Sequence, residues 1–299
     1  MKHFSSYFIL LFITILTVSC SSSDDASSTQ SNYRLIEFIK SSDFGNLSSY
    51  RFEYFDNGLL EKYTWSIEPL GNSEILFSYD DNNRITKIGN FNYEYNTQGA
   101  LIAINKDAPD FYNATVTYTN EDLIENLSGF RNSSGVTSFY NYNITINGLN
   151  QIAIIDEQVT GEFNKRILIA YDTKGNVSEI IRQDNLDDIN FITTSSITYT
   201  YDDKPNITKD FLNNIDYSLY STPDNLNGVN LNSNFDFRIN YVNPNNILTI
   251  TKFVGSEEYQ EIYTYDYNDF DYPISADYSY YVNGNLSETL YYEWVYESY

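Results

Sequence analysis

Short segments in which apolar and polar residues alternate recur along the chain, and this period of two constrains the fold more than any other feature. Phe91, Tyr93 and Tyr95 share one face of their segment, and residues 142–146 and 197–201 alternate in the same way. Because successive side chains of a strand point to opposite faces, each segment predicts a strand with one packed face and one wet face. Antiparallel sheets permit such strands, whereas parallel sheets usually bury both faces.

The segments belong to a degenerate repeat. A strand ends in tyrosine, a turn rich in Asp, Asn or Gly follows, and a strand bearing Ile, Leu or Val comes next. Clear copies occupy residues 51–60, 75–85, 91–101, 167–177, 197–203 and 263–268. Stacked hairpins of this kind predict an all-β fold: a long antiparallel up-and-down meander that forms a curved sheet, superroll or barrel-like domain.

The segments between the predicted strands contain residues that favour turns. The pairs Asn57-Gly58, Asn147-Gly148 and Asn283-Gly284 can take positive φ, so each predicts a tight hairpin. Residues 203–235 depart from the pattern, since Pro205 and Pro223 interrupt them. We expect an irregular excursion there, compatible with a short helical turn over 210–219, inside one β domain that spans 33–299.

The N-terminal residues have the features of a secretion signal. Residues 8–16 are apolar, too few for a membrane span but suited to a secretory signal. Small residues follow and lead up to Cys20. This arrangement resembles a bacterial lipoprotein signal, although Thr17 stands where leucine is usual. We therefore expect residues 1–19 to be a signal peptide and Cys20 to be the lipid attachment site. An ordinary signal peptide with an incidental Cys20 is the alternative.

Residues 20–32 are polar and rich in serine, as expected of a flexible tether between the lipid and the domain. A serine-rich start followed by Asp24-Asp25 resembles the signal that exports lipoproteins of Bacteroidota to the outer face of their outer membrane. This resemblance predicts a surface-exposed protein. A solvated linker that faces the periplasm is the alternative.

Composition excludes several function classes. The chain has one histidine, His3, and one cysteine, so a mature chain beginning at Cys20 has no histidine and no second thiol. Ser-His-Asp triads, Cys-His pairs, zinc sites of Cys and His and disulfides are then excluded. A formal net charge of −24 opposes nucleic-acid binding, while 41% hydrophobic residues oppose disorder. We expect no cofactor.

Tyrosine-aspartate steps followed by a turn resemble the YD repeats of RHS-type surface proteins. The chain is also similar to a family of Bacteroidota lipoproteins of unknown function, YD-repeat-like with a porin-like β-fold. The motifs that carry the likeness are 201–206, 245–246, 263–268 and 272–273, with Ile207 in place of an expected proline. The resemblance covers about residues 50–299, implies the fold, and brings no catalytic residues.

The last segment of the chain, residues 291–299, argues against a membrane-spanning barrel. Along residues 291–299, Glu293 and Glu297 share a face with Tyr299, and in a porin these charges would meet lipid. A lipid anchor would also be redundant for a spanning protein. We therefore expect a sheet or superroll that stands in water, porin-like in shape alone.

Candidate sites are few. Acidic turns such as 80–81, 202–203 and 269–271 could offer oxygens to Ca²⁺, but none has the spacing of a calcium loop, so solvated hairpin tips are expected and no metal site is predicted. Trp65 and Trp294 could stack on sugar rings, although cross-strand packing is the commoner use of aromatic residues. Two carboxylates could act as the acid and base of a glycosidase.

These patterns favour a non-enzymatic lipoprotein of the outer membrane that faces the cell exterior. Its partners would be the membrane, through the lipid on Cys20, and a glycan or an envelope protein bound on its β-surface. The alternative is a polysaccharide-active enzyme that depends on carboxylates. A structural shell element related to RHS cocoons is a third hypothesis, for which the chain is short.

Overall fold

The structure is a computed structural model that describes residues 33–42, 47–67, 71–106, 111–119, 123–133, 135–162, 164–185, 190–206 and 243–298. Every element in these ranges is a strand. Within them, no helix is long and apolar enough to cross a membrane. The predicted signal peptide, Cys20 and the tether lie outside the described residues.

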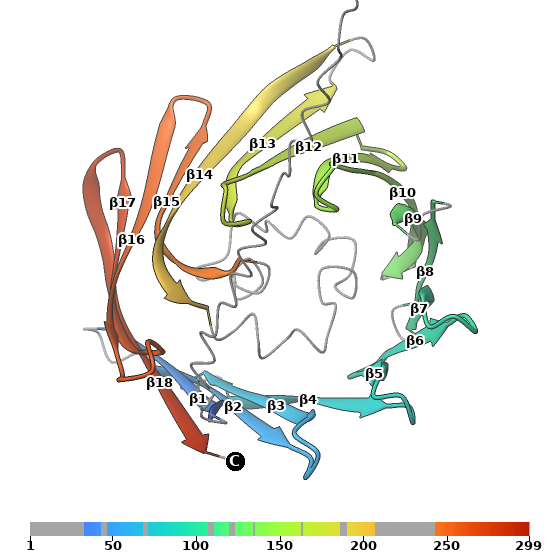
Figure 1. Ribbon diagram of the computed structural model, residues 1–299. Helices are drawn as coiled ribbons and strands as arrows, with labels where there is room; N and C mark the ends of the chain where they lie inside the picture. The colour runs from blue at the N-terminus through green and yellow to red at the C-terminus, as the bar shows by residue number, and fades with distance from the viewer. Residues whose placement is uncertain are drawn as a thin grey trace, which may run out of the picture.

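Eighteen antiparallel strands form one closed barrel (Figure 1). Each strand pairs with its neighbours in sequence, so the fold is an up-and-down meander, and the all-β prediction is confirmed. The strands are β1 (Tyr33–Ser42), β2 (Leu47–Tyr54), β3 (Leu60–Ile67), β4 (Gly71–Tyr79), β5 (Ile85–Ile88), β6 (Phe91–Tyr95), β7 (Leu101–Lys106), β8 (Phe111–Tyr118), β9 (Ile124–Ser133), β10 (Val136–Ile146), β11 (Ile152–Val159), β12 (Asn164–Tyr171), β13 (Val177–Asn185), β14 (Phe191–Pro205), β15 (Asn245–Val254), β16 (Glu257–Tyr267), β17 (Pro273–Val282) and β18 (Asn285–Ser298).

The barrel closes where its first and last strands meet. β1 and β18 pair from Tyr33 opposite Ser298 to Ser42 opposite Leu290, with one irregularity near Glu37. An ion pair of 2.6 Å between Arg34 and Glu297 crosses this seam. Closure leaves the described sheet without a free edge, and a free edge is what exposes a strand to pairing with another chain.

The two faces of the barrel wall differ in chemistry. Side chains on the concave inner face converge, whereas those on the convex outer face diverge and have no second layer to cover them. The buried residues therefore line the inside, and the prediction that the tyrosine-bearing face is the packed one is confirmed. This inner face includes Leu35, Phe38, Phe77, Tyr93, Leu127, Tyr142, Ile155, Ile197, Tyr263, Tyr278 and Tyr292.

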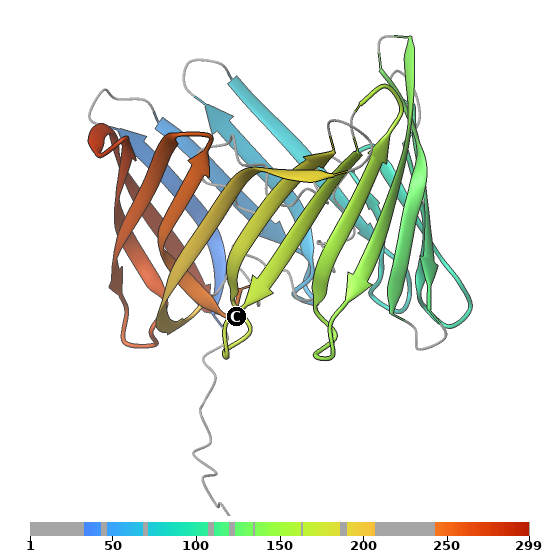
Figure 2. The same ribbon diagram turned by 90° about the horizontal axis from the view of Figure 1, so that it is seen from above.

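One turn recurs at the end of the barrel where the even-numbered strands finish, which Figure 2 shows from the side. In the turn after β6, Asn96 Oδ1 accepts the backbone N–H groups of Gln98 and Ala100, at 3.0 and 2.9 Å. Gly99 has φ 91°, the left-handed region that glycine and asparagine tolerate best. The same Asx bonds are made by Asp80, Asn147, Asp172 and Asn268.

Six tyrosines near the ends of even-numbered strands make the same hydrogen bond. The hydroxyl of each donates to a backbone carbonyl at the start of the preceding strand, over 2.6–2.9 Å. We call this set the tyrosine ladder, and its pairs are Tyr54–Leu35, Tyr79–Leu60, Tyr118–Leu101, Tyr171–Ile152, Tyr201–Val177 and Tyr296–Pro273. At the tyrosine-aspartate pairs Tyr79-Asp80 and Tyr171-Asp172, the hydroxyl of the packed tyrosine has a hydrogen-bond partner. The aspartate that follows caps the turn with its own side chain.

The turn predictions are confirmed in part. Asn283 and Gly284 both have positive φ, as a two-residue hairpin requires. At Asn57-Gly58 only the glycine does, with φ 83°. A hairpin between β10 and β11 forms at Asn147-Gly148, but the expected positive φ of this pair is wrong: Asn147 caps its turn with its side chain, and the left-handed position falls on Asn150, with φ 60°.

The predicted excursion begins later than the sequence pattern indicated. β14 continues to Pro205, and Asn206 is still described. The remainder, including the suggested helical turn over 210–219, lies outside the described residues. The strand pattern is next described in β15.

Candidate functional site

The inner face carries its charged residues near one end of the barrel. This end is the one opposite the tyrosine turns, where short hairpins join β15 to β16 and β17 to β18. We call the half-buried residues gathered here the inner-wall cluster: Lys40, Lys252, Tyr259, Glu261, Tyr280 and Glu288.

Strand register brings the cluster together. Lys252 pairs with Tyr259, Glu261 pairs with Tyr280, and Tyr280 pairs with Glu288, so β15, β16, β17 and β18 contribute neighbouring side chains on the same face. Lys40 arrives from β1 across the seam, opposite Tyr292. Directly opposite residues on one face of an antiparallel sheet interact.

Glu261 is the carboxylate of this cluster that accepts a hydrogen bond from a tyrosine. Its Oε2 accepts the hydroxyl of Tyr263 over 2.8 Å. Burial raises the pKa of Glu261, although this bond and the charges of Lys40 and Lys252 oppose the shift. A carboxyl group in this environment retains its proton to a higher pH than a solvated one.

The two lysines are perturbed in the opposite direction. Burial lowers the pKa of Lys40, while the charges of Glu288 and Glu261 raise it. Burial also lowers the pKa of Lys252, with Glu261 opposing the shift and Arg182 adding to it. The two glutamates therefore lie between the two lysines in the order of the strands, and each charge compensates part of its neighbour's desolvation.

Two aromatic rings border these charges. Tyr259 and Tyr280 lie on adjacent strands with nearly parallel rings, 13° apart, and a centroid separation of 6.4 Å. The Lys252 ammonium lies 5.6 Å from the Tyr259 ring centroid. Both tyrosines are half-exposed, whereas Tyr278 and Tyr292, further along the same wall, are 1% and 0% exposed.

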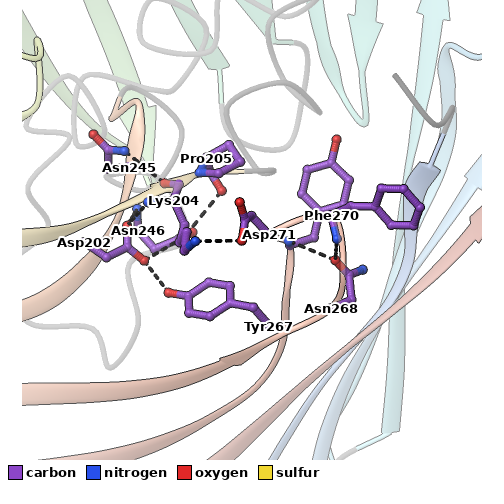
Figure 3. A network of polar contacts seen from close by, with 10 residues as sticks. Asp202, Lys204, Pro205, Asn245, Asn246, Tyr267, Asn268, Phe270 and Asp271 are labelled. Carbon is purple, nitrogen blue, oxygen red and sulfur yellow. Dashed lines mark hydrogen bonds and ion pairs between the residues drawn. The ribbon is translucent and has the colours of Figure 1, made fainter. Parts of the chain in front are cut away.

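A separate polar network lies at the tyrosine end, where β14, β15 and the turn after β16 meet (Figure 3). Asp202 accepts bonds from the backbone and side chain of Asn246, at 3.0 and 3.1 Å, and from the hydroxyl of Tyr267. Lys204 forms an ion pair of 2.7 Å with Asp271. Asp202 and Asp271 therefore bind neighbouring protein groups, so these two acids of the predicted hairpin tips have structural partners.

Buried asparagines continue this network. Asn243 is 0% exposed, and its Oδ1 accepts the backbone N–H of Val177 over 2.8 Å. Asn176 exchanges two bonds of 3.0 Å with Asn245. The side chain of Asn206 donates to the Asn243 carbonyl over 3.0 Å. These bonds hold Asn206 and Asn243 together at the two ends of the segment that joins β14 to β15.

The residues predicted as candidate sites lie in different places. Trp294 is 6% exposed and packs against Phe38, with ring centroids 5.2 Å apart. Trp65 is half-buried on β3 beside Tyr63, at 5.7 Å. Cys20 lies outside the described residues. Sugar stacking by either tryptophan stays a prediction, and Trp65 is the more accessible of the two.

The acidic turns form no metal centre in the described part of the chain, where no group of three or more acidic, His or Cys residues could hold an ion. Asp80 instead caps its own turn and forms an ion pair of 2.6 Å with Arg84. The hydrogen bond from Arg84 is the largest of the effects that lower the pKa of Asp80.

Sequence reasoning did not find the inner-wall cluster. Lys40, Glu261 and Glu288 are far apart in the chain, and with 41 Asp and Glu residues in the sequence no single acid stands out. One signal was present: on β16, Glu261 occupies the inward position between Tyr259 and Tyr263, where the alternation predicts an apolar or aromatic residue.

No protein-family model matches the chain, and no curated protein matches it. A solved structure titled a porin-like protein from Bacteroides uniformis is similar, with 15% identity and a TM-score of 0.49, over 90% of this chain and 98% of that one. A porin-like protein from Bacteroides vulgatus has 13% identity and a TM-score of 0.45, over 78% and 97%. Membership of the YD-repeat-like family stays a prediction.

Proposed function

We propose that this protein is a lipid-anchored lipoprotein of the outer membrane, exposed at the cell surface, whose barrel stands in water and acts as a non-enzymatic binding or scaffold module. The observation that carries the proposal is the chemistry of the outer wall. Ion pairs lie on it, including Arg51–Glu37 at 2.9 Å and Arg166–Asp156 at 2.6 Å, among exposed apolar residues such as Leu76, Phe130 and Phe139.

Hydrogen-bonded amides continue this polar surface. The side chain of Asn113 donates to Asn105, at 2.6 Å, and Asn105 in turn donates to Glu94, at 2.7 Å. Membrane-spanning barrels have the reverse arrangement, with an apolar band outside and polar residues inside. Placing these charges and amides in lipid would remove their hydration, so an aqueous setting fits this wall better.

The acylated Cys20 would be the anchor, and residues 20–32 would be the flexible tether between the lipid and the barrel. Expression in a host that processes bacterial lipoproteins, with radioactive palmitate in the medium, tests this directly. The wild-type protein should carry label and sediment with membranes, whereas C20A should be unlabelled and soluble. An unmodified Cys20 thiol in the purified wild-type protein would contradict the anchor.

Surface exposure needs a separate measurement. Proteinase K added to intact cells should degrade the wild-type protein, while a periplasmic marker protein stays whole. Protection of the barrel until the outer membrane is broken would place it in the periplasm instead. Either result leaves the outer-wall argument unchanged, because both compartments are aqueous.

A carboxylate-dependent polysaccharide-active enzyme is the second candidate. Glu261 and Glu288 favour it, since they share the inner face with one strand between them, which puts their backbones about 9–10 Å apart. The raised pKa of Glu261 is what a general acid requires. Screening the protein on polysaccharides, with E261Q and E288Q beside it, separates the two candidates: hydrolysis lost in both variants would replace the binding proposal.

A further inference from the structure

We infer that the inner-wall cluster is a binding site for a neutral saccharide, with a sugar ring against Tyr259 and Tyr280 and its hydroxyl groups on the charged side chains around them. The inference rests on the proposed function, which it makes specific by naming the site and the ligand class. The observations that carry it are the ring geometry, the charge pattern and the position of the cluster.

The ring pair supplies the apolar part of such a site. Rings of Tyr259 and Tyr280 that are nearly parallel, on adjacent strands, form a platform about as wide as one sugar ring. Other rings of the inner wall, such as Tyr63 and Trp65, are half-buried as well, and Tyr292 is 0% exposed, so what distinguishes Tyr259 and Tyr280 is the charged groups beside them. Half-exposed rings on this wall next to charged groups therefore offer a surface for a ligand rather than more core.

The charge pattern selects a neutral, hydroxyl-rich partner. Lys40 and Lys252 can donate hydrogen bonds, and Glu261 and Glu288 can accept them, whereas a sugar hydroxyl does both. The charge of Arg182 also acts on Lys252, and Glu257 accepts the Tyr259 hydroxyl, so three cations and three anions balance here, and a ligand with a net charge would leave one of them uncompensated. This balance is local, because the chain as a whole has a formal net charge of −24.

The cluster lies beside hairpins that are held by hydrogen bonds. Tyr259 lies near the start of β16, and the hairpin between β17 and β18 is bonded to that start: Asn283 donates to the Glu258 carbonyl over 2.7 Å, and its side chain accepts the Glu258 N–H over 2.9 Å. These bonds fix the two hairpin ends that carry the rings. A rigid, pre-organised platform binds with less loss of conformational entropy.

Isothermal titration calorimetry on the mature acylated protein in detergent micelles tests the inference. The probes are four neutral oligosaccharides, namely maltohexaose, cellohexaose, xylohexaose and mannohexaose. At least one should bind to the wild-type protein, and Y259A and Y280A should each weaken that binding at least about tenfold. E288Q and K40M should weaken it also, because each removes a partner of the sugar hydroxyls.

The chain offers a matched control. Tyr281 follows Tyr280 in β17 and pairs with Gln260, so its side chain lies on the outer face. Y281A should bind as the wild type does. Y280F keeps the ring and should retain binding, and thermal unfolding of every variant identifies any loss that comes from misfolding.

Three results would overturn the inference: no binding of any of the four probes, unchanged binding in folded Y259A and Y280A, or equal loss in Y281A. Failure of the proposed function is distinguishable from these. Absence of palmitate on Cys20 would remove the anchor and leave the saccharide site intact. Hydrolysis of a bound probe that E261Q and E288Q abolish would support the site and replace the binding module by an enzyme.

Discussion

The hydroxyl of Tyr201 donates to the backbone carbonyl of Val177 over 2.6 Å, linking a tyrosine near the end of β14 to the first residue of β13. The equivalent bond recurs five more times around the barrel. Each bond lets a buried phenol keep a hydrogen-bond partner, and each ties the end of one strand to the start of the strand before it. The tyrosine ladder therefore links neighbouring strands at the tyrosine end of the barrel, and its rings are also part of the core.

Removal of one ladder hydroxyl should destabilise the barrel measurably. Y201F keeps the ring but leaves the Val177 carbonyl without this donor, and we expect the free energy of unfolding to fall by about 1 kcal/mol. Urea denaturation followed by circular dichroism measures it. Y281F, on the outer face, is the matched control and should stay within about 0.5 kcal/mol of the wild type. Equal effects of the two variants would contradict the structural role of the ladder.

Alkali should unfold the barrel through its tyrosines. Burial raises the pKa of Tyr171 from 10 to about 12, and it raises the pKa of Tyr201 and Tyr296 as well. A raised pKa in the folded state means that these phenols contribute stability that is fully present below pH 10 and is lost as the pH rises through the folded values.

The ultraviolet absorbance of tyrosinate and the far-ultraviolet circular dichroism should be recorded together during an alkaline titration. Buried tyrosines should ionise in the same pH range in which the β signal disappears, at or above about pH 12 for Tyr171. Complete ionisation of all tyrosines while the β signal persists would contradict the burial described here.

Gly129 should be intolerant of even one methyl group. A Cβ there would lie 1.8 Å from the Asn113 carbonyl oxygen and 2.6 Å from the Tyr140 hydroxyl, which donates to that same oxygen over 2.5 Å. G129A must break this bond or shift β8 away from β9, so we expect a loss of about 3 kcal/mol in the free energy of unfolding.

Gly148 is the control for this substitution. Its φ is not positive, and no atom lies within 4 Å of a Cβ built there. G148A should therefore change the free energy of unfolding by less than about 0.5 kcal/mol. A stable G129A protein with an unchanged denaturation midpoint would show that β8 and β9 are not packed as described.

Asn243 should be needed for the junction of β13 and β15. N243A removes the acceptor of the buried Val177 N–H, so we expect a cost of about 2 kcal/mol. N285A, at an exposed hairpin, should be close to neutral. Denaturant unfolding compares the two, and a neutral N243A would contradict a buried role for the asparagine network.

Local chemistry made much of the fold predictable. The alternation in residues 91–95 and 197–201 identifies strands and their packed faces, because a period of two acts within a few residues. Asn283-Gly284 identifies its hairpin for the same reason. At Asn147-Gly148 the hairpin was predicted but the conformation of the pair was wrong, because the side-chain cap of Asn147 prevailed over the left-handed preference of the pair.

The candidate site was less predictable because its residues meet only across strands. Glu261 is visible in the sequence as a charge in a tyrosine row, but nothing local indicates that Lys40 and Glu288 lie near it. Trp294 illustrates the converse: a tryptophan is a natural candidate for sugar stacking, and its packing against Phe38 and Tyr265 appears only in three dimensions.

By itself the amino-acid sequence determined which segments are strands, which face of each is packed and how the turns at the tyrosine end are made, since all three depend on neighbours a few residues apart. Only the tertiary structure decided that the meander closes, with Arg34 beside Glu297, and that charges from β1, β15, β16 and β18 converge on one part of the inner wall. The physical reason is that closure and cross-strand neighbours depend on the number, tilt and register of all the strands together, and no short stretch of chain encodes these quantities.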